Sequence, residues 1–109
     1  MTINHRKVHR DPEVLWREED ASRAEAYAGL AKGEDAGAIG TSVLFSDGVM
    51  LSLNVLGTEI WKRCEGRTVD EIVLDLTQEF YVEPAVLKAD ALAFLAELEH
   101  KGFIRYEDA

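Results

Sequence analysis

The clearest pattern of apolar and polar positions in the chain lies between residues 42 and 53. The runs Ser42–Ser46 and Val49–Leu53 are mainly apolar, and the dipeptide Asp47-Gly48 separates them. Asp-Gly tolerates the positive φ angles of a type I′ turn, whose twist matches that of two paired strands. Because side chains alternate along a strand, successive residues of the second run face opposite sides. The pattern predicts a β-hairpin.

Three helices are predicted after the hairpin, each from its own boundary residues. Asn54 can cap a helix whose apolar residues recur at helical spacing, and Gly66 can end it in the left-handed conformation. The segment Thr68–Glu71 has the residue types of a capping box, which satisfies exposed N–H groups at a helix start. Glu83-Pro84 opens the third helix, which we expect to run to Lys101, because proline suits the first helical position.

The remaining segments carry weaker signals. Val14–Glu18 is a strand candidate. Ala21–Lys32 is predicted as a short helix that Gly33 ends, and Glu34–Gly40 as a loop. Residues 103–106 fit either a final short strand or an extended tail.

Together these elements predict one α+β domain. It covers residues 14–109, with an inserted segment at about residues 20–40, and residues 1–13 are expected to be a flexible N-terminal segment. A three-stranded antiparallel sheet followed by three helices is typical of winged helix-turn-helix architectures. The length of 109 residues suits one domain, and 47% hydrophobic residues can fill its core.

The charge balance limits the partners. Twelve Lys and Arg stand against 21 Asp and Glu, a formal net charge of −9, which disfavours DNA and anionic membrane surfaces. A winged-helix transcriptional regulator is the alternative function. However, the predicted third helix has no arginine, and it carries Lys88 and Lys101 against Asp90, Glu97 and Glu99. Without a membrane-spanning run or a secretory signal, the chain is expected to be cytoplasmic.

The residues that could carry chemistry do not form a recognisable catalytic or metal site. His5 and His9 lie four residues apart, but a third ligand is not found nearby in the sequence. Cys64 falls in an apolar stripe, which indicates a buried structural thiol. The acids of the second predicted helix lie opposite its apolar stripe, where they form a solvated face. We therefore expect neither enzymatic activity nor a bound metal or cofactor.

The predicted third helix has a wider apolar face than one core contact requires. At helical spacing, the core stripe is formed by Leu87, Ala91, Phe94 and Leu98. Leu92 and Leu95 form a flank beside this stripe. Either the first two helices cover both sides, or the flank is a groove wall left open for a partner. Beside it, Val49–Leu53 is a candidate sheet edge, and such an edge next to an apolar helix is what strand addition by a peptide requires.

The second half of the sequence resembles the PqqD-like family, that of the pyrroloquinoline quinone synthesis protein D. The resemblance is carried by the order and spacing of four motifs, Leu53-Asn54-x-x-Gly57-x-x-Ile60-Trp61-x-x-Cys64-Glu65-Gly66, Thr68-Val69-x-Glu71-Ile72-Val73, Phe80-x-Val82-Glu83-Pro84 and Asp90-x-x-x-Phe94-Leu95-x-x-Leu98-x-x-x-Gly102-Phe103-Ile104. The long insert between the first two strands departs from the family pattern. It suggests a specialised subfamily rather than the quinone pathway itself.

The resemblance implies a noncatalytic peptide chaperone, or precursor-peptide recognition element. Such a domain binds the leader of a ribosomally synthesised peptide and presents it to a modifying enzyme, often a radical S-adenosylmethionine (SAM) protein. The leader is expected to add as a strand beside Val49–Leu53 and to lie against the third helix; whether the chain forms a homodimer is left open. The predicted peptide-binding residues are Val49, Met50, Leu51, Ser52, Leu53, Leu87, Lys88, Ala91, Leu92 and Leu95. Leu51→Pro is expected to abolish binding by removing a backbone N–H.

Overall fold

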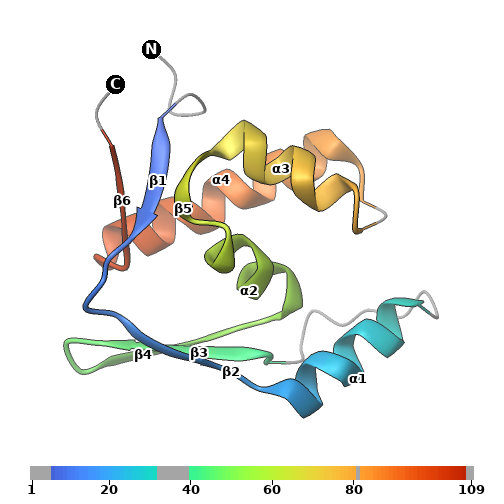
Figure 1. Cartoon of the computed structure of the whole chain (residues 1–109), viewed down its shortest axis with the longest axis horizontal. Coiled ribbons are helices and arrows are strands. Elements are labelled where there is room, and N and C mark those ends of the chain that lie inside the picture. The colour runs from blue at the N-terminus through green and yellow to red at the C-terminus, as the bar shows by residue number, and fades with distance from the viewer. Residues whose placement is uncertain (1–5, 32–39, 81, 108–109) are drawn as a thin grey trace. The chain divides into compact units, whose positions relative to one another are not determined.

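The structure is a computed structural model, and it describes residues 6–31, 40–80 and 82–107 (Figure 1). The chain divides into two compact units, and each is described by itself. We call Pro12–Glu59 the hairpin unit, and Met1–Asp11 together with Ile60–Ala109 the helical unit.

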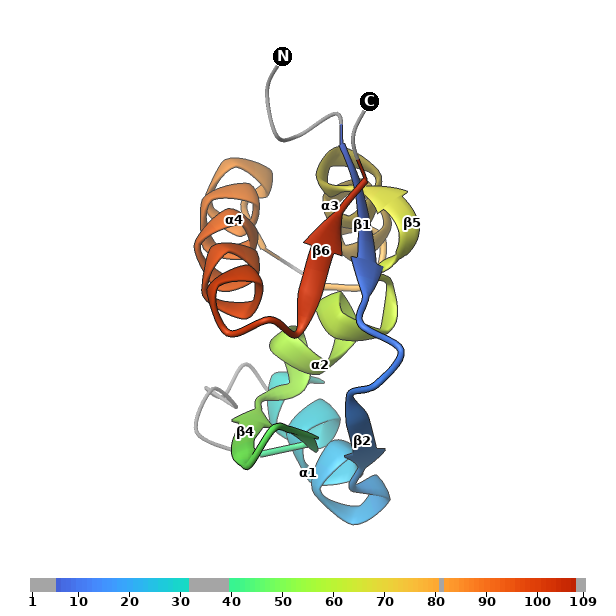
Figure 2. The ribbon, with the colours of Figure 1, turned by 90° about the vertical axis from the view of Figure 1, so that its left-hand side faces the viewer.

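The hairpin unit contains the predicted three-stranded antiparallel sheet. Its strands are β2 (Leu15–Glu18), β3 (Ser42–Ser46) and β4 (Val49–Leu53), in the order β2-β3-β4. Strands β2 and β4 are the two edge strands of this sheet, with β3 between them (Figure 2). Each therefore has one edge that pairs with no other strand among the described residues.

The predicted turn between β3 and β4 is confirmed by its backbone angles. Asp47 has φ 51° and Gly48 has φ 77°, as a type I′ turn requires. At the other end of the hairpin, the N–H of Thr41 donates to the carbonyl of Leu53 at 2.8 Å, although the register places Ser42 opposite Leu53. Thr41, just before β3, and Ser42, the first residue of β3, thus both lie opposite Leu53 of β4. Two residues against one in a pair of strands form a β-bulge.

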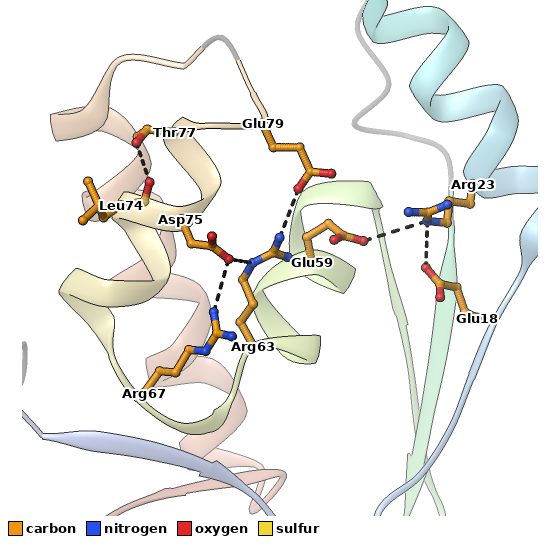
Figure 3. A network of polar contacts seen from close by, with 9 residues as sticks. All are labelled: Glu18, Arg23, Glu59, Arg63, Arg67, Leu74, Asp75, Thr77 and Glu79. Atoms are coloured by element: carbon orange, nitrogen blue, oxygen red, sulfur yellow. Dashed lines mark hydrogen bonds and ion pairs between the residues drawn. The ribbon is translucent and has the colours of Figure 1, made fainter.

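The inserted segment contains a helix, α1 (Asp20–Ala31), which begins one residue earlier than predicted, and its predicted last residue, Lys32, lies outside the described residues. Arg23 of α1 lies 3.1 Å from the Glu18 carboxylate in β2 and 4.0 Å from that of Glu59 (Figure 3). The Arg23 guanidinium also lies over the Tyr27 ring, 4.8 Å from its centroid. Only 5% of the Glu59 side chain is exposed, so Arg23 supplies positive charge to a buried carboxylate. Gly33 and the predicted loop up to residue 39 lie outside the described residues.

The helical unit contains a second three-stranded antiparallel sheet, which the sequence did not predict. Its strands are β1 (Lys7–Arg10), β5 (Glu65–Thr68) and β6 (Ile104–Tyr106), in the order β5-β1-β6. The expectation of a flexible segment at residues 1–13 is therefore wrong for Lys7–Arg10, which is the central strand. Val8 is fully buried, and the strand is held by hydrogen bonds to partners far away in the sequence. The final strand β6 resolves the alternative left open for residues 103–106.

Three helices follow the hairpin, as predicted: α2 (Val55–Lys62), α3 (Val69–Thr77) and α4 (Pro84–His100). Asn54 caps α2, since its side-chain oxygen accepts the N–H of Gly57 at 2.9 Å. However, α2 ends at Lys62, and Gly66 does not terminate it. Gly66 instead lies in β5, where its φ of 82° explains why glycine is needed.

The start of α3 and the end of α4 also follow the sequence prediction. The Thr68 hydroxyl accepts the N–H of Glu71 at 3.2 Å, and the Glu71 carboxylate accepts the N–H of Thr68 at 3.0 Å, which completes the capping box. Helix α4 begins at Pro84 and ends at His100, one residue before the predicted end, with Lys101 as its C-cap and Gly102, at φ 79°, directly after it. The architecture is thus α+β with the expected sheet and three following helices, to which α1 and the β5-β1-β6 sheet are added.

Candidate functional site

The open edge of β4 is the backbone part of the candidate site. Because the Leu53 carbonyl points toward β3, where it accepts from Thr41, the backbone groups of every second residue of β4 face β3. Those residues are Val49, Leu51 and Leu53. The N–H and C=O groups of Met50 and Ser52 point the other way, toward the open edge. This alternation corrects the expectation for Leu51→Pro, which would remove an N–H from the β3–β4 ladder and leave the open edge intact.

Apolar side chains cover the face of this sheet on which Met50 stands. In the strand register Leu15 lies opposite Phe45, and Phe45 lies opposite Met50, so the three side chains form one row across β2, β3 and β4. We call this the outer row. Its members are 68%, 46% and 70% exposed, respectively. A hollow of about 220 Å³ lies at the β2 end of the row, lined by Leu15, Trp16, Arg17, Val43 and Phe45.

The opposite face of the sheet is the buried one. Leu44 is fully buried and Leu53 is 3% exposed, whereas Leu51 is half-buried and Val49 is 45% exposed. Burial on this face therefore falls toward the hairpin turn. The five predicted residues of β4 are thus one buried, one half-buried and three exposed side chains.

A group of buried hydroxyls joins this sheet to α2. The hydroxyl of Thr58 lies 2.7 Å from that of Thr41 and 2.7 Å from that of Ser42. All three side chains are at most 1% exposed. The contacts satisfy hydroxyl groups that would otherwise be costly to bury. They also hold Thr41 and Ser42, at the start of β3, against α2.

The helix half of the predicted site is mostly buried. Leu87, Ala91 and Leu95 are fully buried on α4, where α3 and β6 pack against the helix. Leu92 is half-buried, and the Lys88 ammonium lies 2.9 Å from the Asp70 carboxylate of α3. The predicted site is therefore divided between the two units, since β4 belongs to the hairpin unit and α4 to the helical unit. Lys88 and Leu92 are the predicted helix residues that keep exposed surface.

Sequence reasoning missed Leu15 and Phe45, the two members of the outer row that lie outside β4. A signal for them was present in β3, where Val43, Leu44 and Phe45 are consecutive apolar residues. A strand with one solvated face would alternate apolar and polar residues. The unbroken apolar run therefore indicated that both faces of this sheet are apolar.

The single cysteine is buried in the helical unit. Cys64 is 1% exposed, its thiol donates to the Ile60 carbonyl at 3.2 Å, and burial raises its pKa to about 12. A thiol with this pKa remains protonated near neutral pH and is a poor nucleophile. The prediction of a buried structural cysteine is confirmed.

A charged cluster at the end of α2 joins it to α3. The Arg63 guanidinium donates to the Asp75 carboxylate at 2.6 Å and to the Glu79 carboxylate at 3.0 Å, and Arg67 donates to Asp75 at 3.2 Å (Figure 3). The hydrogen bond from Arg63 lowers the pKa of Asp75. Two of the acids that the sequence placed on a solvated face, Asp75 and Glu79, thus contribute to holding α3.

Within residues 6–31, 40–80 and 82–107, no group of three or more His, Cys, Asp or Glu side chains is placed to hold a metal ion. His9 is among these residues and lies 3.2 Å from the Glu107 carboxylate, whereas His5 lies outside them. None of the helices in the same ranges combines the length and apolar character needed to cross a membrane.

A three-stranded sheet with an open final edge, followed by three helices, places the protein in the class of PqqD-like domains. The family model of coenzyme PQQ synthesis protein D (PqqD) matches residues 40–104, and the chain belongs to this family. The matched segment begins just before β3, so it includes the hairpin and all three helices that follow it.

Solved structures share the fold. TbiB1 in complex with the TbiA(beta) leader peptide has a TM-score of 0.66 and 22% identity, covering 92% of this chain and 99% of that one. Lasso peptide synthetase B1 complexed with the leader peptide has a TM-score of 0.64 and 20% identity, covering 91% and 98%. The PqqD truncation of Methylobacterium extorquens PqqCD, a stand-alone recognition element for ribosomally synthesised and post-translationally modified peptides, has a TM-score of 0.64 and 21% identity, covering 96% and 94%. No curated protein matches the chain.

Proposed function

We propose that this protein is a noncatalytic recognition element for a ribosomally synthesised precursor peptide. The leader of the peptide adds as a strand to the open edge of β4 and is presented to a modifying enzyme. The observation that carries the proposal is the edge itself, where the N–H and C=O groups of Met50 and Ser52 point away from β3. Membership of the PqqD family and the leader peptides bound by TbiB1 and the lasso peptide synthetase B1 support it.

The charge of the hairpin unit favours a basic peptide. Residues 12–59 contain three Lys and Arg against nine Asp and Glu, a formal charge of −6. A peptide with Lys or Arg near the strand-forming segment would be attracted by this charge, and the attraction would weaken as salt screens it. Affinity that falls with ionic strength is therefore expected.

Further parts of the proposal rest on the family resemblance. Lys88 and Leu92 of α4 contact the peptide beyond its strand, and the modifying enzyme is a radical SAM protein. We place the complex in the cytoplasm. For a homodimer, the open edge of β2 offers a second copy a strand with which to pair.

DNA binding is not proposed, because the surface of α4 has the wrong charge for it. Asp90, Glu97 and Glu99 are exposed on this helix, and they would repel phosphates. The fold resemblance to winged helices concerns the order of elements, whereas binding depends on the side chains that the elements present.

Amide chemical shifts of the labelled protein test the proposal directly. The protein is titrated with a synthetic peptide covering the first half of the short reading frame nearest its gene, and separately with a short DNA duplex. We expect the peptide to shift the amides of Met50 and Ser52 with saturation, and the duplex to leave them unchanged. Tight, salt-sensitive DNA binding, or no saturable effect of any leader from the gene neighbourhood on β4, would contradict the proposal.

A further inference from the structure

The outer row ends at the edge where the peptide is proposed to bind. Leu15, Phe45 and Met50 lie directly opposite one another across three strands, and Met50 is the last of them. A peptide strand beside β4 would place every second side chain on this same face, in line with the row. The row is therefore continuous with the surface of the added strand.

The exposed area of the row limits what can cover it. From the exposed fractions of its three side chains, it presents roughly 350 Å² of mostly apolar surface. A stable dimer usually buries about 800 Å² on each partner, so a second copy packed on this row alone would be weakly held. The side chains of a single strand match the area better.

We propose that the outer row is a specificity site for the bound peptide, and that it selects a large apolar side chain, aromatic or long aliphatic, opposite Met50. The inference rests on the proposed strand addition and adds which residue type the strand must carry on its outer face. That side chain packs directly on Met50 and extends the apolar row to a fourth strand, with Met50 between it and Phe45.

The backbone geometry of β4 fixes the position of this side chain. Because the N–H and C=O groups of Met50 both face the open edge, an antiparallel peptide forms a hydrogen-bonded pair with Met50, and one peptide residue lies directly opposite it. In such a pair the two side chains stand on the same face, about 5 Å apart at their Cβ atoms. The selected residue is therefore defined by register.

Two positions further along the peptide, a different type of side chain is required. The peptide residue there faces Ser52, whose side chain is short and polar. A Cβ atom on Gly40 would lie only 2.7 Å from the Ser52 hydroxyl, so the Gly40 backbone already passes close to this side chain. A small or hydroxyl-bearing residue fits this position. The expected outer-face pattern is thus one large apolar residue and one small or hydroxyl-bearing residue, separated by one position.

A library of random strand-length peptides displayed on phage tests the inference without knowledge of the natural leader. It is selected in parallel against the native protein, against the double variant Phe45→Thr/Met50→Thr, and against Leu74→Thr. Threonine is compatible with exposed strand positions. Leu74 is 66% exposed on α3, in the helical unit, so its variant loses a similarly exposed apolar side chain that does not belong to the row.

We expect native protein and Leu74→Thr to enrich the same pattern, and the double variant to lose the preference for the large apolar residue. Peptides selected on native protein should bind the double variant about 5- to 50-fold more weakly. The inference is overturned if selected peptides protect the Met50 and Ser52 amides from exchange but show no apolar preference, or the same preference on the double variant.

Failure of the proposed function would look different, since no selected peptide would then protect those two amides. A second copy of the chain could cover the outer row instead of a peptide. Sedimentation velocity of the native protein and of the double variant tests this alternative. Native protein that dimerises while the double variant stays monomeric would show that a second copy covers the row, which would also overturn the inference.

Discussion

Met50 and Leu51 are neighbours in β4, and their backbone N–H groups face opposite ways. That of Leu51 faces β3, and that of Met50 faces the open edge. One strand therefore offers adjacent positions at which the same substitution has different consequences. Proline at the first position affects what the edge can bind, whereas proline at the second affects whether the hairpin forms.

Met50→Pro is expected to abolish peptide binding while the protein stays folded. The substitution removes one N–H from the open edge and none from the β3–β4 ladder. Met50→Val is the matched control, because it keeps the N–H and suits a strand. Isothermal titration with the leader peptide should show no binding for the proline variant and measurable binding for the valine variant. Leu51→Pro should instead lower the unfolding temperature strongly. Equal binding by the proline and valine variants at position 50 would argue against strand addition at β4.

Thr58→Val should destabilise the protein by about 1–3 kcal/mol. The valine fills the same space, but the buried hydroxyls of Thr41 and Ser42 lose the oxygen that lies 2.7 Å from each. Thr58→Ser keeps that oxygen and is expected to cost less. Urea unfolding of both variants measures the difference. A valine variant at least as stable as the serine variant would show that the hydroxyl group contributes nothing.

Arg23→Ala should destabilise the protein by about 2 kcal/mol, because Arg23 contributes positive charge beside the buried Glu59 carboxylate. Arg17→Ala is the control, since Arg17 has a side chain that is 78% exposed and pairs with Glu19 at the surface. Thermal unfolding followed by circular dichroism compares the two. Similar unfolding temperatures for both variants would mean that the inserted helix is not fixed through Arg23.

The stability contributed by Asp75 should disappear in acid. The hydrogen bond from Arg63 lowers the pKa of Asp75 in the folded state, so its contribution is present above the unfolded-state pKa and is lost as the pH falls through the folded-state pKa. Asp75→Asn should therefore be less stable than native protein at about pH 7 and nearly as stable at about pH 2. Urea midpoints at the two pH values provide the test, with Asp90→Asn as an exposed control. A difference that persists undiminished in acid would exclude the charge of Asp75 as its cause.

Elements with local signals were predictable from the sequence. The Asp47-Gly48 turn and the Thr68–Glu71 capping box depend on residues within a few positions of one another, and both were confirmed. Strand β1 was missed because its hydrogen-bonding partners are β5 and β6, more than fifty residues away. Its four residues contain one apolar side chain, Val8, which leaves no alternating pattern to detect.

The exposure of the side chains in the predicted site was easier to predict on β4 than on α4, for a related reason. Helical spacing placed Leu95 on a flank and Phe94 within the core stripe of α4, but the structure buries Leu95 fully and Phe94 only partly. Spacing gives the angles between side chains, whereas burial depends on what packs against the helix. For β4 the alternation itself defines the two faces, so the sequence placed Met50 and Leu51 on opposite sides correctly. The unbroken apolar run of β3 also carried a signal for Phe45, whereas Leu15 joins the Met50 face only through the pairing of β2 with β3.

Hydrogen exchange of the β4 amides with and without a leader peptide tests strand addition most directly. In the free protein the amides of Val49, Leu51 and Leu53 face β3, and those of Met50 and Ser52 face the open edge. Peptide binding is predicted to slow exchange at Met50 and Ser52 strongly and to change the other three far less. Saturable peptide binding that leaves Met50 and Ser52 exchanging as in the free protein would contradict the account.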